Sequence, residues 1–146
     1  MSNHDVEWRK GSDGLGGTYT FSNPKPSTIA LPGKVQKIVE FKIPLLDGSL
    51  VQELNNDSRT LTVQGFLYSK TGTYDDLDQK RRSLESGIGT GEGQFHIISN
   101  EGQANSKHIY YKGIPQSIQY PAGRNNPHLM EYNINILCAD PTEYIV

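Results

Sequence analysis

The segment from Leu129 to Ala139 constrains the fold more than any other part of the chain. Its apolar side chains fall at every second position: Met130, Tyr132, Ile134, Ile136 and Cys138. Polar residues fill most of the positions between them. Because an extended strand sends alternate side chains to opposite faces, the pattern predicts a β-strand with one buried face. The rest of the chain must supply a sheet around that strand.

Other segments have strand character of the same kind. Residues 34–54 combine an alternating stretch with Asp47-Gly48, a two-residue turn signal, so a β-hairpin is expected there. Further strands are expected at residues 60–69, 94–99 and 107–120. Gly65 is expected to mark a bulge or a close approach of the backbone. Because Pro115 cannot donate a ladder hydrogen bond, the last of these segments forms two strands or one edge strand with a break.

The stretch that follows Thr73 has the pattern of an α-helix. Thr73 and Asp76 have the spacing of a capping box, and acidic residues gather where the helix dipole favours them. The apolar stripe of this helix is formed by Tyr74, Leu77, Leu84 and Ile88. Gly87 and Gly89 are expected to end it.

These elements together predict a mainly β fold, a split β-barrel or sandwich with one flanking α-helix. A chain of 146 residues has the size of one ordinary domain. Residues 34–146 are expected to form the core domain. Residues 1–33, rich in Gly, Ser, Asn and Pro, are expected to be an N-terminal extended arm, either without fixed structure or ordered against a neighbour. The core should bury Val39, Phe41, Val63, Leu67, Leu77, Leu84, Ile134 and Ile136.

Composition argues against several classes of function. The formal charge is −2, from 14 basic and 16 acidic residues, so the chain lacks the excess of cations that dominates nucleic-acid binding. It has no apolar run long enough to span a bilayer, and its first residues are polar where a signal peptide would be apolar. With one cysteine, an intrachain disulfide is impossible.

No constellation of catalytic or metal-binding residues is recognisable. The glycine-rich stretch from Gly87 to Gly93 follows a helix, whereas a phosphate-binding loop precedes one. The four histidines lack the paired spacing of zinc enzymes: His4, His96, His108 and His128. Cys138 shares a face with apolar residues and is expected to be a small buried side chain. We therefore expect no catalytic residue, no metal and no cofactor.

Tyrosines suggest one alternative function. Tyr110, Tyr111, Tyr120 and Tyr132 fall in predicted strands, and a sheet with exposed aromatic rings is a common design for binding sugars. A carbohydrate-binding module is therefore a second hypothesis. A small β-barrel enzyme without a recognisable site is a third.

The C-terminal part of the chain resembles phage distal tail proteins. The alternating strand that runs into Asp140-Pro141-Thr142-Glu143-Tyr144 is similar to the closing strand of that family. The strand from Thr60 to Gly65 and the helix that begins near Asp75 resemble further elements of it. The resemblance covers residues 34–144, and we expect this chain to lack the galectin-like second domain that many members carry.

The resemblance implies a ring-forming distal tail adapter. Such proteins assemble as homohexamers that connect the tail tube protein to baseplate hub or tail tip proteins, and DNA passes through the lumen without specific binding. It further implies synthesis in the host cytoplasm, a location at the tail tip of the virion and no contact with a membrane. A tail tube protein of related fold is the nearest alternative. Subunit contacts are expected at Trp8, Tyr19, Phe21, Gly89, Gly91 and Arg124.

Overall fold

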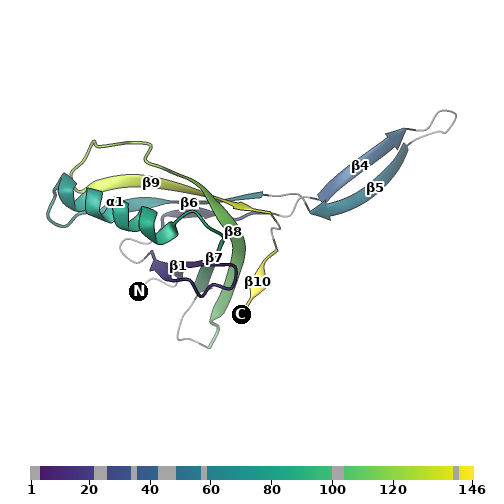
Figure 1. The fold of residues 1–146 in the computed structure, drawn as a ribbon, viewed down its shortest axis with the longest axis horizontal. Helices are drawn as coiled ribbons and strands as arrows, with labels where there is room; N and C mark the ends of the chain where they lie inside the picture. Colours follow the sequence, from purple (N-terminus) through teal and green to yellow (C-terminus); the bar gives the residue numbers. More distant parts are fainter. Residues whose placement is uncertain are drawn as a thin grey trace.

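The computed structural model describes residues 4–21, 26–33, 36–42, 49–56, 59–99, 104–139 and 142–146. Side chains are described for these residues except 4, 5, 36–42 and 49–56. The elements, in chain order, are β1 (His4–Lys10), β2 (Thr18–Thr20), β3 (Thr28–Ala30), β4 (Gln36–Lys42), β5 (Ser49–Asn56), β6 (Arg59–Tyr68), α1 (Tyr74–Ile88), β7 (Gly93–Ser99), β8 (Lys107–Gln119), β9 (Leu129–Cys138) and β10 (Tyr144–Ile145). The fold is mainly β with one flanking helix, as the sequence predicts (Figure 1).

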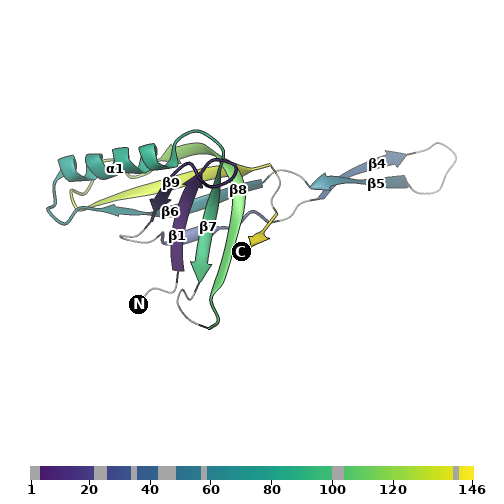
Figure 2. The same ribbon diagram turned by 60° about the horizontal axis from the view of Figure 1, so that its bottom comes forward.

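Eight strands form one antiparallel sheet in the order β2-β1-β7-β8-β9-β6-β3, with β10 added beside β8. The long strand β8 joins its two halves, because residues 107–113 pair with β7 and residues 114–119 pair with β9. Figure 2 shows β1 and β7 running across the direction of β6 and β9. The sheet is not closed; it folds over so that both halves and α1 contribute to one core.

Strand β8 is a single strand with a register shift between Pro115 and Ser117. Its pairing with β7 ends at Gly113, so Pro115 lies where the strand is paired with β9 alone. The missing N–H of proline therefore removes no hydrogen bond to β7. The expected irregularity at Pro115 is thus confirmed, but the expectation of an edge strand is wrong, because β8 lies between β7 and β9 in the sheet.

The helix begins and ends where the capping residues predict. The Thr73 hydroxyl accepts a hydrogen bond from the Asp76 N–H at 3.3 Å. Gly89, at φ 67°, follows the last turn, and its N–H donates to the Glu85 carbonyl. The helix buries Leu77, Leu84 and Ile88. It therefore covers the core with the apolar stripe that its sequence defines.

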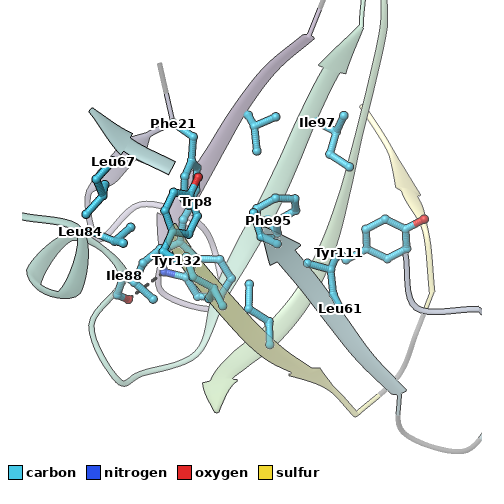
Figure 3. Packing of buried hydrophobic residues seen from close by; sticks show 14 of the residues in the cluster. Trp8, Phe21, Leu61, Leu67, Leu84, Ile88, Phe95, Ile97, Tyr111 and Tyr132 are labelled. Atoms are coloured by element: carbon cyan, nitrogen blue, oxygen red, sulfur yellow. Dashed lines mark hydrogen bonds between the residues drawn. The ribbon is translucent and has the colours of Figure 1, made fainter. Parts of the chain in front are cut away.

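The core is aromatic at its centre. Trp8 and Phe95 are fully buried, and Tyr132 is 2% exposed (Figure 3). Phe21 meets Phe95 with ring centroids 6.1 Å apart in an edge-to-face arrangement. Position 65 requires glycine, because a methyl group there would lie 2.6 Å from the Tyr132 hydroxyl. The expected close approach at Gly65 is thus confirmed, and the β6–β9 register continues through it without a bulge.

The structure corrects our view of the N-terminal residues as an extended arm. Strand β1 lies inside the sheet between β2 and β7, and Trp8 is completely buried. Val6 and Trp8 face the core at alternate positions, which is a short strand pattern surrounded by Gly-rich sequence. The pattern was not recognised because residues 1–33 as a whole are rich in Gly, Ser, Asn and Pro, which is typical of segments without a core. Residues 4–21 are therefore built into the folded body.

Six of the expected core residues are buried, which confirms the predicted strand faces: Val63, Leu67, Leu77, Leu84, Ile134 and Ile136. Val39 and Phe41, the other two, lie where side chains are outside the description. Leu61 and Phe95 are core residues that the sequence did not single out, and Trp8 is a core residue that was expected at a subunit contact.

The predicted hairpin is confirmed as strands β4 and β5, which pair from Gln36↔Asn56 to Lys42↔Ser49. Its turn at Asp47-Gly48 lies outside the described residues. The two strands form a separate two-stranded sheet, and Figures 1 and 2 show it extending away from the body.

Two substitutions on β9 test the buried face. Ile134 is fully buried and Leu137 is 38% exposed. We expect Ile134→Ala to lower the free energy of unfolding by about 2–5 kcal/mol, because it removes buried carbon atoms and leaves a cavity. Leu137→Ala should cost about 1 kcal/mol or less. Urea unfolding followed by circular dichroism measures both, and equal losses would show that the two faces of β9 are misassigned.

Candidate assembly interface

Within the described residues, no three His, Cys, Asp or Glu side chains lie close enough together to hold a metal ion. Among these residues, no helix has the length and the apolar character needed to cross a membrane. The sheet has two outer faces of different character.

The outer face of β1, β7 and β8 carries a pair of histidines. His96 Nδ1 and His108 Nε2 are 2.6 Å apart, and His96 Nε2 is 2.9 Å from Gln94 Oε1. The Gln94 amide is oriented because its nitrogen donates to the Ser12 carbonyl at 3.0 Å. Gln94 Oε1 can only accept, so His96 Nε2 carries the proton, and neutral His96 accepts a hydrogen bond from His108. The Ser12 carbonyl thus orients the Gln94 amide, and that orientation determines the tautomers of both His96 and His108.

Aromatic rings extend this pair across the same face. Tyr110 stacks on His96 at 4.8 Å and on Tyr144 of β10 at 5.0 Å, and the Lys112 ammonium lies 4.9 Å from the Tyr144 ring centroid. The other three tyrosines of the carbohydrate-binding hypothesis are also not free to stack on a sugar ring. Tyr111 and Tyr132 are buried, and Tyr120 is half-buried with its hydroxyl donating to Glu85. These four rings do not form an open stacking platform.

The outer face of β6, β9 and the second half of β8 is almost free of charge. Thr62 donates to the Asn135 side-chain oxygen, and the Asn135 amide donates to the Ser117 hydroxyl, each at 3.1 Å. Neutral hydrogen bonds thus connect three strands. Exposed apolar residues lie at both ends of this face: Phe66, Tyr68 and Leu129 at one end, Ile114 and Leu137 at the other.

The six residues expected at subunit contacts lie in different parts of the structure. Trp8 and Phe21 are corrected to core residues, because both are buried. Tyr19 is half-buried against Phe21, with ring centroids 5.0 Å apart. Gly89 forms the helix C-cap, and Gly91 is exposed in the next loop.

Arg124 is exposed but already bound within its own chain. Its guanidinium pairs with the carboxylate of Asp78 and lies 5.4 Å from the Tyr74 ring centroid. Arg124 therefore fastens the loop before β9 to the helix. The six expected contact residues do not form one surface, and the exposed aromatic residues of β6 were missed.

The histidine pair makes stability depend on pH. Burial, reinforced by the positive charges of Arg9 and His108, lowers the pKa of His96 from 6.5 to about 4, while Glu7 opposes the shift. As the pH falls below 6.5, the His96 imidazole therefore becomes protonated in the unfolded chain while it stays neutral in the folded chain. We expect His96 to contribute about 3 kcal/mol above pH 6.5, a contribution that is lost between pH 6.5 and 4.

Thermal unfolding at several pH values measures this dependence. His96→Gln should flatten the curve between pH 6.5 and 4, because it removes the titrating group. Gln119→Asn, a substitution at an exposed residue of β8 that does not titrate, is the control and should keep the wild-type slope. A His96→Gln curve parallel to the wild type would contradict the assignment.

Comparison with known proteins identifies the fold. No protein-family model matches the chain, and no curated protein matches it. A chain of the anti-feeding prophage baseplate, from a six-fold symmetrised cryo-EM structure, is similar over all of this chain and 93% of its own length, at 8% identity and a TM-score of 0.61. A chain of the anti-feeding prophage tube-terminating cap is similar over 97% of this chain and 88% of its own, at 9% identity and a TM-score of 0.54. The overall fold is thus one that occurs in a baseplate and in a tube cap.

Proposed function

We propose that this protein is a non-enzymatic structural component of a phage-like tail, a ring that connects the tail tube to the baseplate hub or tail tip. Its fold is similar over the whole chain to a baseplate protein, and over 97% of the chain to a tube cap. A fold alone does not define a function. The proposal therefore depends on an observation about this chain.

That observation is the isolated β4–β5 hairpin. Its strands pair with each other and, among the residues that the structure describes, with no other strand. A two-stranded hairpin is at best marginally stable in water, and its outer edges carry unpaired backbone N–H and C=O groups. A partner outside the chain would satisfy these groups, and a second copy is the simplest partner.

Contacts between unlike surfaces of identical copies give a closed ring when the rotation closes. We infer a homohexamer, which agrees with the six-fold symmetry of the similar baseplate structure. A formal charge of −2 would let DNA pass through such a ring without being held. The protein would be synthesised in the host cytoplasm and act at the tail tip.

Removing the hairpin tests the proposal. We expect the wild-type protein to form rings in mass photometry and negative-stain electron microscopy, alone or with a tube protein. A variant in which a short Gly-Ser linker replaces residues 36–56 should stay monomeric, because the joint is lost while the eight-stranded sheet remains. Circular dichroism should show that the variant is folded. Wild-type monomers under every condition, or rings of the shortened variant, would disprove the proposal.

Electron microscopy of the intact particle separates an adapter from a tube. An adapter binds tube on one face and a different protein on the other, so we expect this chain in one or two rings at the tail tip. A tube protein stacks its own rings without limit. Density for the chain along the whole tail would assign it to the tube.

A further inference from the structure

A cleft of about 490 Å³ lies between the turn that joins β1 to β2 and the last turns of α1. Apart from glycines, its lining residues carry either a positive charge or a hydroxyl group: Lys10, Thr18, Arg82, Ser83 and Ser86. Among the residues that the structure describes, no Asp or Glu lines it. We call it the basic cleft. Its side chains favour a negatively charged ligand, although the chain as a whole has a formal charge of −2.

Both walls of the basic cleft are fixed by contacts within the chain. The Lys10 ammonium donates to the Ser86 carbonyl at 2.7 Å, and the Lys10 backbone N–H donates to the Gly17 carbonyl at 2.8 Å. The helix passes so close to β2 that a methyl group at Gly87 would lie 2.3 Å from the Tyr19 ring. An ammonium group has three protons, so two of them remain for a ligand. The cleft is therefore formed before any ligand binds.

Arg82 is the second cation of the basic cleft, and its charge is not used within the chain. The neighbouring Arg81 forms ion pairs with Asp78 and Glu85. Arg82 is exposed and makes no ion pair with any residue in the described ranges. A guanidinium presents its N–H groups as a planar fork that matches the two oxygens of a carboxylate. The basic cleft is therefore suited to an acidic side chain.

The other end of the same helix carries acidic side chains. Asp75-Asp76 is the only pair of adjacent acidic residues in the sequence. Asp75 is exposed, and neither carboxylate has an ion-pair partner in the part of the chain that the structure describes. Because an α-helix rises about 1.5 Å per residue, Asp75 and Ser86 are about 16 Å apart along the axis. Asp75 therefore cannot enter the basic cleft of its own chain.

Building on the proposed ring, we propose that the basic cleft receives the first turn of α1 from a neighbouring copy. Asp75 of one copy then lies between Lys10 and Arg82 of the next. The contact is heterologous, because the acidic turn and the basic cleft are different surfaces at the two ends of one helix. Each copy donates one acidic turn and receives one, which is the arrangement that a ring requires. The contact is a second joint between copies, in addition to the hairpin.

The role of this joint is to select which surfaces of two copies meet. An exposed ion pair contributes little affinity by itself. Complementary charges nevertheless speed association and disfavour wrong orientations, in which like charges face each other. Because salt screens exposed charges, ring formation should weaken as the salt concentration rises.

Charge reversal tests the match between the two surfaces. Arg82→Glu and Asp75→Arg should each raise the protein concentration needed for ring formation by at least about tenfold, because like charges then meet at every joint. An equimolar mixture of the two variants should assemble again, because alternating copies restore every opposite-charge pair. Mass photometry measures assembly, and circular dichroism checks that each variant is folded.

Lys107→Glu is the matched control for Arg82→Glu, because it makes the same change of charge at an exposed residue of β8 outside the cleft. It should assemble like the wild type. Rings that neither reversal weakens, or weakened variants that the mixture does not rescue, would overturn the proposal and leave the proposed function intact.

A disulfide trap tests the geometry independently. Cys138 is buried, so thiols introduced by Asp75→Cys and Ser83→Cys would react without competition. Under mild oxidation, a chain with both substitutions should form a ladder of linked subunits on a non-reducing gel, whereas either substitution alone should leave monomers. Linked dimers without larger species would show a two-fold contact, and rings without any ladder would place the joint elsewhere; both results overturn the proposal. A wild type that never forms rings would remove the proposed function as well.

Discussion

The burial of Trp8 joins the first strand to two elements that come much later in the chain, the end of α1 and the start of β7. Its indole N–H donates to the Ile88 carbonyl at 3.0 Å, at the end of the helix (Figure 3). Its ring lies over Gly93, where a methyl group would come within 2.4 Å of it. The first strand, the end of α1 and the start of β7 therefore meet at one side chain. The carbonyl that Trp8 binds belongs to a helix terminus, where acceptors lack a partner within the helix.

The dependence of β1 on contacts with α1 and β7 explains which parts of the fold were predictable from the sequence. Strand β9 and helix α1 carry their signals locally, as alternation and as capping residues with an apolar stripe. Strand β1 has two alternating core residues, Val6 and Trp8, between polar neighbours, and its stability comes from β7 and the helix. A local pattern cannot report such tertiary support. That is why residues 4–21 were expected outside the body.

The candidate interface was less predictable because it depends on strand register. Leu67 was expected in the core, but only the pairing of β6 with β9 shows that the outward Phe66 and Tyr68 lie beside Glu131 and Leu129. His96 and His108 are twelve residues apart and meet only because β7 and β8 pair as they do. The hairpin was expected, but its separation from the main sheet depends on how the remaining strands pair.

The long strand β8 also explains why the two outer faces differ in what they can bind. With its first half beside β7, it belongs to a face that carries Glu7, Arg9, His96 and Lys112, whose charges and hydrogen bonds are already engaged within the chain. A partner on that face would have to remove water from charged groups, which costs free energy unless each group finds a new partner. With its second half beside β9, the strand belongs to a face of hydroxyl, amide and apolar side chains. A protein partner would therefore lose least free energy to desolvation on the face of β6 and β9, which also presents exposed aromatic rings.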